Sequence, residues 1–222
     1  YFAKMYRLPR EKFSVIPVSS RFEGLMPTDA IPFERRKKVH FHGEIQRFHG
    51  LDEILPSINS IGNMGFTTSL YLGDKGEKWS RKNLTSMNEK VQVFTKSVPY
   101  TALRGSMENS LATLGIFRKS EKADLVIPNK VVESLSLGIP CITLSTVSTR
   151  NLVENGKLGD NPAEYGLILV DAPSGLETAI KALADDENTW RRSSHNARKL
   201  YKEVFNSRKN EGKLGQLIQE VA

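Results

Sequence analysis

The fold is decided by residues 125–144, which read LVIPNKVVESLSLGIPCITL. Pro128 suits the first turn of a helix, and Asn129 is a residue type that caps the free backbone amides there. Apolar side chains then recur at helical spacing until Gly138, which ends the helix because glycine adopts the left-handed conformation without strain. The apolar run at 139–144 is typical of a strand that is covered on both faces. The stretch therefore predicts a loop, a short helix and a buried strand in succession.

Two charged side chains, Lys130 and Glu133, fall in the first turns of this predicted helix. At spacing i, i+3 they lie on one side of the helix. Free amides at a helix start, together with a nearby lysine, form a binding site for an anion such as phosphate. A carboxylate one turn later can accept hydrogen bonds from sugar hydroxyls. For an arbitrary Lys-x-x-Glu pair, however, a solvent-exposed ion pair is the commoner arrangement.

The surrounding residues favour the anion site. Residues 128–140 follow the pattern Pro-Asn-Lys-x-x-Glu-x-x-x-x-Gly-x-Pro and lead into an apolar strand. The pattern resembles the nucleotide-sugar motif of GT-B glycosyltransferases, in the large retaining group of the family-4 type. The resemblance implies that Asn129 and Lys130 contact the diphosphate of a nucleotide-sugar donor and that Glu133 holds its ribose. It also implies the fold class, an α/β protein with a Rossmann-like doubly wound parallel sheet, as the C-terminal half of a GT-B fold.

A weaker match to the same family lies at residues 43–50. A strand, a glycine, a loop and a helix follow one another here, an arrangement that presents backbone amides to a phosphate. The family usually has Gly-Arg/Lys-x-x-x-x-Lys-Gly, whereas this chain has Glu44 and His49 at the two basic positions. The resemblance therefore implies that Gly43 and Arg47 bind the donor diphosphate. The alternative is that Arg47 lies on a solvent-exposed loop and binds nothing.

The family also implies contacts with the nucleobase and the sugar. The loop after the third predicted strand contacts the base in such enzymes, which implies Val98 and Tyr100 here, although Tyr100 could equally pack at the start of a helix. Many members carry a Glu-x7-Glu pair whose first glutamate contacts the donor sugar, but the matching position in this chain is Leu125. Glu121 or Asp124 could replace that glutamate. The departure leaves the transferred sugar and the catalytic competence of the chain open.

Strands and helices alternate along the chain from about residue 39 to about residue 185, which predicts a parallel doubly wound sheet. The expected divisions are a linker segment with a first short strand at 1–38, a donor-binding Rossmann-like domain at 39–205 and a C-terminal helix at 206–222.

Three local features are also expected. The first short strand falls at residues 13–18, where a proline terminates it. Pro56 lies inside the helix that begins near residue 51, and it should kink or shorten that helix because it lacks a backbone N–H. Residues 118–124 are polar and should form a loop.

Composition limits the classes of partner. The 222 residues carry a net charge of +7, which favours anionic partners such as phosphates or an anionic membrane face. No recognised nucleic-acid motif is present, so we expect no nucleic acid partner. The single cysteine, Cys141, excludes an intrachain disulfide and fits a reducing compartment. The predicted location is therefore the cytoplasm, with the inner face of the membrane as the alternative.

The function implied by the resemblance is transfer of a sugar from a nucleotide diphosphate sugar to an acceptor hydroxyl, with retention, in polysaccharide or glycoconjugate biosynthesis. Because the chain begins with Tyr1 and has no signal-peptide pattern, we expect a fragment of a longer protein. A sugar or a lipid-linked acceptor would bind through a missing N-terminal half. The isolated chain is therefore expected to transfer no sugar.

No metal ion or cofactor is expected beyond the donor substrate itself. The resembling enzymes generally need no divalent cation, and no His, Cys or carboxylate spacing in this chain resembles a metal site. His40 and His42 alternate along the first strand, and because side chains at a strand end are more often structural than ligands, both are interpreted as structural. Two other functions stay open. One is a GT-B nucleotide-sugar epimerase, and the other is a non-catalytic module that binds a nucleotide sugar or a partner.

Overall fold

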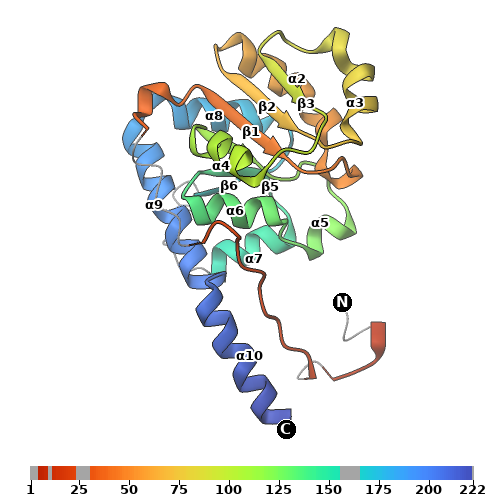
Figure 1. Ribbon diagram of the computed structural model, residues 1–222, viewed down its shortest axis with the longest axis vertical. Coiled ribbons are helices and arrows are strands. Elements are labelled where there is room, and N and C mark those ends of the chain that lie inside the picture. Colours follow the sequence, from red (N-terminus) through yellow and green to blue (C-terminus); the bar gives the residue numbers. More distant parts are fainter. Residues whose placement is uncertain (1–4, 10–11, 24–30, 156–165, 222) are drawn as a thin grey trace.

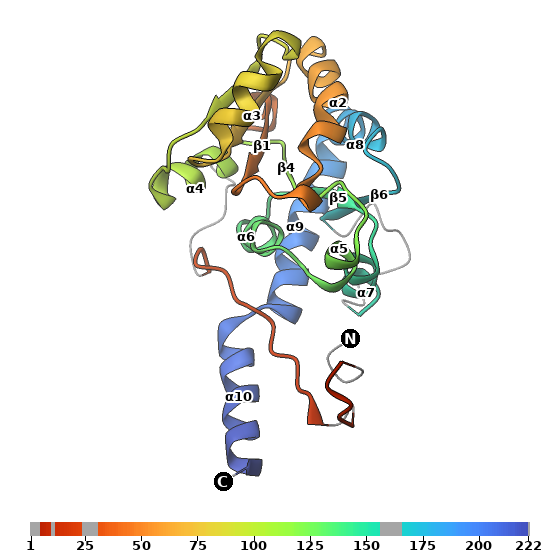
Figure 2. The same ribbon diagram turned by 90° about the vertical axis from the view of Figure 1, so that its right-hand side faces the viewer.

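A parallel sheet forms the centre of the molecule. The computed structural model describes residues 5–9, 12–23, 31–155 and 166–221 (Figures 1 and 2). Within these residues, six strands run parallel in the order β3-β2-β1-β4-β5-β6. The strands are β1 (Lys38–His42), β2 (Thr67–Tyr71), β3 (Val91–Phe94), β4 (Ala112–Leu114), β5 (Cys141–Leu144) and β6 (Leu167–Val170).

Helices connect the strands, and this alternation confirms the predicted α/β, Rossmann-like doubly wound fold. Because the strand order reverses between β1 and β4, the chain winds outward in opposite directions from these two strands. The α-helices are α2 (Leu51–Asn63), α3 (Gly76–Asn83), α4 (Tyr100–Glu108), α5 (Glu121–Leu125), α6 (Asn129–Leu137), α7 (Val147–Asn155), α8 (Gly175–Asp185), α9 (Glu187–Val204) and α10 (Ser207–Val221). The 3-10 helices η3 (Phe33–Arg35), η4 (Arg47–His49) and η5 (Leu84–Ser86) lie among them.

Strand β1 turns alternate side chains to the two faces of the sheet. Val39 and Phe41 belong to the core cluster that also contains Ile54 of α2 and Ile180 of α8. His40 and His42 point to the opposite face, where they form hydrogen bonds to side chains of α4 and α6. The apolar positions of β1 thus anchor one helical layer, and its histidines face the other.

Helix α6 lies on the face that the histidines occupy. Its Val131 packs with Leu200 of α9 in a second core cluster. The helix ends at Gly138, whose φ of 69° is the left-handed conformation that the sequence predicts. Pro128, rather than Asn129, occupies the N-cap position, and no side chain caps this end. The packing of α6 places its N-terminus beside the carboxyl end of β1.

Residues 12–23, here called the strap, form no strand, so the strand predicted at 13–18 is wrong. The strap lies against the ends of α9 and α6 instead of a sheet edge. The Ser20 amide donates to the Tyr201 hydroxyl at 3.0 Å, and Ser19 Oγ donates to the Phe205 carbonyl at 2.7 Å. Hydrogen bonds to α9 and the residue that follows it therefore replace strand pairing.

Two other local predictions concern a helix interior and a loop. Helix α2 runs through Pro56, so of the two predicted effects the shortening does not occur, and the kink stays a prediction. The missing N–H removes a single helical hydrogen bond, and burial of the apolar side of α2 outweighs that loss. The end of the expected loop at 118–124 belongs to α5, because Ser120 Oγ accepts a hydrogen bond from the Ala123 amide and caps the helix.

Helix α10 extends away from the sheet and lies beside the strap (Figures 1 and 2). Asn210 Nδ2 donates to the Pro17 carbonyl at 2.9 Å, and the Glu23 carboxylate accepts from the Ser207 amide at 3.1 Å. The strap thus connects α10 to the start of the α/β body.

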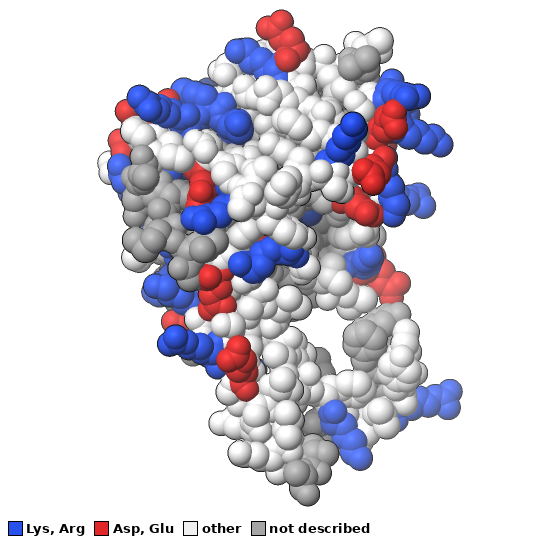
Figure 3. Space-filling view, viewed as in Figure 1, with Lys and Arg blue, Asp and Glu red and all other residues white. Residues whose placement is uncertain are grey.

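Charged side chains are mixed on the face shown in Figure 3. Lys and Arg are scattered among Asp and Glu there and do not form one continuous basic stripe. Among the described residues, none of the helices combines the length and the apolar character that crossing a membrane would require.

Candidate functional site

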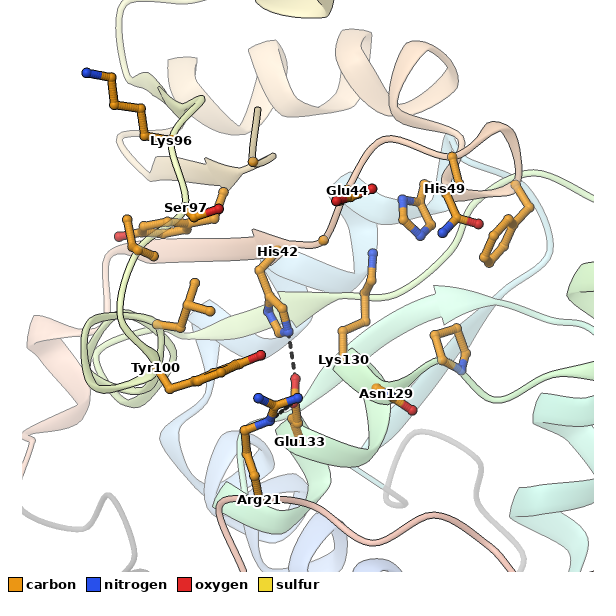
Figure 4. Close-up of a pocket in the computed structure, with 18 residues that line it drawn as sticks. Arg21, His42, Glu44, His49, Lys96, Ser97, Tyr100, Asn129, Lys130 and Glu133 are labelled. Atoms are coloured by element: carbon orange, nitrogen blue, oxygen red, sulfur yellow. Dashed lines mark hydrogen bonds and ion pairs between the residues drawn. The ribbon is translucent and has the colours of Figure 1, made fainter. Parts of the chain in front are cut away.

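A cleft of ≈ 610 Å³ opens beside the carboxyl ends of β1, β2 and β3 and the start of α6 (Figure 4). It lies next to the point where the strand order reverses, which is where doubly wound sheets bind ligands. Six residues predicted from the sequence line it, namely Gly43, Val98, Tyr100, Asn129, Lys130 and Glu133. The tertiary structure therefore brings residues from three separate parts of the chain to one cleft.

Lys130 is the most unusual charged group in the cleft. Its side chain is buried, and its Nζ forms no hydrogen bond within the described part of the chain. The amine lies 3.8 Å from the centroid of the Phe41 ring. Burial lowers the pKa of this amine to about 7, because the charged form loses its hydration. A buried ammonium without a counter-ion is unfavourable, so an anion that enters the cleft would supply the missing partner.

Gly43 brings the backbone turn after β1 close to this amine. Its φ of +133° is accessible to glycine and strained for other residues. A Cβ at this position would lie 3.1 Å from Lys130 Nζ and 3.5 Å from His49 Cε1. A side chain here would therefore press on the lysine, and the glycine leaves room for an anion to approach it.

The loop after Gly43 carries no cation at the two positions, 44 and 49, where the resembling family has basic residues. Burial lowers the pKa of His49 to about 3, so the ring is neutral at pH 7. Glu44 forms an exposed ion pair with Lys75 at 2.7 Å. Arg47 is exposed in η4 and does not line the cleft, although its two neighbours in sequence do. The contact between Arg47 and a diphosphate stays a prediction.

Glu133 is buried beside Lys130, which rules out a solvent-exposed Lys-x-x-Glu pair. Its Oε2 lies 2.7 Å from Nε2 of His42, and its Oε1 lies 3.2 Å from Nε of Arg21 (Figure 4). The Arg21 guanidinium also lies over the ring of Tyr100, 3.6 Å from its centroid. The carboxylate that the sequence assigns to a ribose therefore has one oxygen toward β1 and one toward the strap.

The histidines of β1 continue the hydrogen bonds behind Glu133. His42 Nδ1 lies 3.0 Å from Nε2 of His40, and His40 Nδ1 lies 2.9 Å from Oγ of Ser106 on α4. Burial is the largest cause that lowers the pKa of both rings. The sequence interpretation of these histidines as structural overlooked that His42 lines the cleft. Their alternation at the end of a strand was the signal in the sequence that could have placed His42 at the cleft.

Val98 and Tyr100 line the other end of the cleft, together with Tyr71 of β2. The Tyr71 ring stacks on that of Phe94 of β3, with centroids 4.3 Å apart and planes 6° apart. Sequence reasoning missed Tyr71, because nothing local distinguishes a cleft-lining tyrosine from one packed in a sheet. This end of the cleft offers flat aromatic and backbone surfaces, which suit a planar ligand such as a base.

Known proteins resemble this chain in structure. No family model matches the sequence, and no curated protein matches it. A sucrose-phosphate synthase from Thermosynechococcus elongatus matches with a TM-score of 0.69 and 16% identity, over 99% of this chain and 55% of that one. A glycosyltransferase from Rickettsia africae ESF-5 matches with a TM-score of 0.73 and 10% identity, over 97% and 59%. Anabaena HepE, solved in complex with UDP-glucose, matches with a TM-score of 0.60 and 15% identity, over 85% and 50%.

The fold is one found in GT-B glycosyltransferases. The chain spans between 50% and 59% of the length of these three structures. At such identities the likeness establishes the fold, and the chemistry of the site rests on this chain's own residues.

The two acids proposed to replace the missing first glutamate lie outside the cleft lining. Glu121 is exposed in the first turn of α5. Asp124 Oδ1 accepts a hydrogen bond from the Val147 amide at 2.9 Å, at the start of α7. Sugar binding by either acid stays a prediction. Among the described residues, no group of His, Cys, Asp and Glu is arranged to hold a metal ion.

Proposed function

We propose that this chain is the donor-binding half of a glycosyltransferase that moves a sugar from a nucleoside diphosphate sugar to an acceptor hydroxyl. The observation that carries the proposal is the buried amine of Lys130, which has no hydrogen-bond partner in the described chain and lies beside Gly43. An anion is the partner that such an amine lacks. The start of α6, with its partial positive charge, adds to the attraction.

The order of groups along the cleft fits an extended nucleotide. Gly43 lies beside Lys130, and Arg21 joins Glu133 to Tyr100. In the proposed pose, Gly43, Asn129 and Lys130 would bind the diphosphate, Glu133 the ribose and Tyr100 the base. That order follows the covalent order of a nucleoside diphosphate. The UDP-glucose named with the HepE structure belongs to the same ligand class.

The chemistry follows from the leaving group. Departure of a nucleoside diphosphate builds negative charge on its terminal phosphate, and a charged Lys130 beside a helix N-terminus stabilises that charge. We further propose retention of configuration, a family-4 type of site and no need for a divalent cation, as the motif at 128–140 implies. A sugar or lipid-linked acceptor would bind to a preceding half. A cytoplasmic location, with the inner face of the membrane as the alternative, belongs to the same proposal.

A second candidate is a module that binds a nucleotide sugar without transferring it. Leu125 occupies the position of the sugar-contacting glutamate, and Asp124 is engaged at the start of α7. A nucleotide-sugar epimerase would use the same donor site. Product analysis separates the three functions, because a transferase lengthens its acceptor, an epimerase changes the free donor and a binding module does neither.

The proposal is tested by calorimetry with UDP, GDP and ADP beside uridine, guanosine and adenosine. Lys130→Ala should weaken the binding of the diphosphates by about 1.5–3 kcal/mol, the worth of a charged hydrogen bond, and leave the nucleosides nearly unchanged. Lys96→Ala is the matched control, because Lys96 is an exposed lysine at the base end of the cleft. Equal losses for diphosphates and nucleosides would overturn the phosphate assignment.

A further inference from the structure

Four side chains form a continuous hydrogen-bonded row that runs from α4, across β1, to the cleft. Ser106 Oγ lies 2.9 Å from His40 Nδ1, His40 Nε2 lies 3.0 Å from His42 Nδ1, and His42 Nε2 lies 2.7 Å from Glu133 Oε2. Ser106, His40 and Glu133 are buried, and the side chain of His42 is 13% exposed. The row joins three elements that are far apart in the sequence.

The row admits one order of protons when both rings are neutral. A carboxylate only accepts, so His42 Nε2 carries a hydrogen and donates to Glu133. His42 Nδ1 is then an acceptor, which requires that His40 Nε2 carry a hydrogen. His40 Nδ1 is an acceptor in turn, and the Ser106 hydroxyl donates to it. Burial lowers the pKa of both rings, which favours this neutral arrangement at pH 7.

The row acts on the orientation of the Glu133 carboxylate. A glutamate side chain on a helix has several rotatable bonds and would sample several directions. Its Oε2 is held by His42 from inside the protein, while Oε1 faces Arg21, whose side chain is 45% exposed. The oxygen toward the strap is therefore the one that His42 does not hold, and the inner oxygen fixes its position.

We propose that His42, supported by His40 and Ser106, is a positioning residue that presents Glu133 to the ribose hydroxyls of the nucleotide. The proposal rests on the proposed function, since it concerns the ribose part of that donor site. A carboxylate with a fixed direction loses less conformational entropy when it binds a diol than a freely rotating one does. The row thereby contributes to affinity for ribose, although His40 and Ser106 do not contact the nucleotide.

The row also links two parts of the nucleotide site. Helix α4 carries Tyr100 at the base end of the cleft and Ser106 at the inner end of the row. Helix α6 carries Glu133 and Lys130. Hydrogen bonds through β1 therefore hold the base-binding helix and the ribose-binding helix at a fixed separation.

The first experiment compares UDP and GDP with their 2′,3′-dideoxy forms by calorimetry. His42→Phe keeps a ring of similar volume but removes the hydrogen bond, and His42→Gln keeps an N–H that can reach the carboxylate. We expect His42→Phe to weaken the ribonucleotides about tenfold or more and to change the dideoxy forms little. His42→Gln should recover most of that loss. A purely structural role would weaken both kinds of nucleotide alike, and that result would overturn the proposal.

Two milder variants complete the series. Ser106→Ala removes the inner donor of the row and should weaken the ribonucleotides by less than His42→Phe does, again sparing the dideoxy forms. Ser134→Ala is the matched control, because Ser134 is a buried hydroxyl next to Glu133 on α6 and bonds to Thr113 at 2.6 Å, outside the row. A ribonucleotide-specific loss in Ser134→Ala would contradict the assignment to His42.

A second experiment needs no nucleotide. In the ¹⁵N NMR spectrum of the wild-type chain at pH 7, His40 and His42 should both carry their proton on Nε2 and leave Nδ1 bare. A proton on Nδ1 of either ring would overturn the row. If the wild-type chain bound neither the ribonucleotides nor the dideoxy forms, the proposed function and the ribose role would both fail, even with the expected tautomers. If the wild-type chain bound nucleotides but the His42 and Ser106 variants weakened ribonucleotides and dideoxy forms alike, only the ribose role would fail.

Discussion

At the scale of single residues, the buried amine of Lys130 contributes to how the stability of the protein changes above pH 7. The pKa of Lys130 is about 7 in the folded chain and near 10.4 in an unfolded one. Between these values the unfolded state binds more protons than the folded state. The free energy of unfolding therefore gains a contribution that rises with pH through this window, because proton binding favours the unfolded state less as the pH rises.

Lys130→Met should isolate this contribution. Methionine keeps the buried apolar stem against Phe41 and removes the amine. We expect the variant to be more stable than the wild type at pH 7 and below, with the difference shrinking as the pH rises toward 10. Urea unfolding of both proteins at pH 6, 7, 8 and 9 measures it. A difference that stays constant with pH would show that Lys130 has an ordinary pKa.

Gly43→Ala should damage both the backbone and the anion site. Its positive φ should cost about 1–3 kcal/mol of stability, and the added Cβ would meet Lys130 Nζ at 3.1 Å. Gly65→Ala is the matched control, because Gly65 also has a positive φ but open space around the added carbon. Both variants should lose stability in urea unfolding, and only Gly43→Ala should lose affinity for UDP or GDP. If Gly43→Ala and Gly65→Ala bound UDP or GDP with equal affinity, Gly43 would not be part of the phosphate site.

At the scale of elements, the strap is attached to the body by one buried ring and several polar contacts. Phe22 is buried with Met107, Leu137 and Ile139, whereas Arg21 reaches Glu133 from a side chain that is 45% exposed. Burial of apolar area contributes more to attachment than a solvent-accessible ion pair does. The ring therefore attaches the strap, and the arginine mainly shapes the cleft.

Two variants of the strap should separate these contributions. Phe22→Ala should lower the free energy of unfolding by about 3–5 kcal/mol, as a large-to-small change in a core does. Arg21→Ala should lower it by about 1 kcal/mol or less, because water screens the ion pair. Thermal or urea unfolding measures both. A larger loss for Arg21→Ala would mean that the polar contacts hold the strap.

At the scale of the whole molecule, we expect the chain to fold alone and to bind a nucleoside diphosphate weakly while transferring no sugar. Core clusters cover both faces of the sheet, so the fold does not need another domain to bury its apolar surface. The chain nevertheless spans about half the length of the matching structures. Transfer needs an acceptor site and exclusion of water around the reacting bond.

The comparison is between this chain and a longer version in which the proposed acceptor-binding half is joined to it. Circular dichroism and urea unfolding report folding, calorimetry reports binding of UDP and GDP, and product analysis reports transfer. Robust transfer by the chain alone would contradict the prediction. Failure of both versions to transfer, with binding intact, would favour the non-catalytic module.

The sequence alone determined the elements whose signals lie within a few residues. Gly138 ends α6 as predicted, and the helix begins one residue after Pro128, which lies at the N-cap and not in the first turn. Both ends depend on local backbone preferences, which is why the sequence locates them to within a residue. The alternating strands and helices predicted the parallel sheet for the same reason. Of the donor-site residues predicted from the 128–140 motif, Asn129, Lys130 and Glu133 line the cleft.

Only the tertiary structure decided what surrounds those residues. Lys130 contacts Phe41, and His42 bonds to Glu133, which lies 91 positions away, so both contacts join distant segments. The lack of a hydrogen-bond partner for Lys130 Nζ within the described residues likewise depends on which segments surround it. The loss of hydration that lowers the Lys130 pKa is likewise a property of the packed chain, not of its neighbours in sequence. Local patterns specify which groups a helix carries, whereas burial and pairing depend on which other elements pack against it.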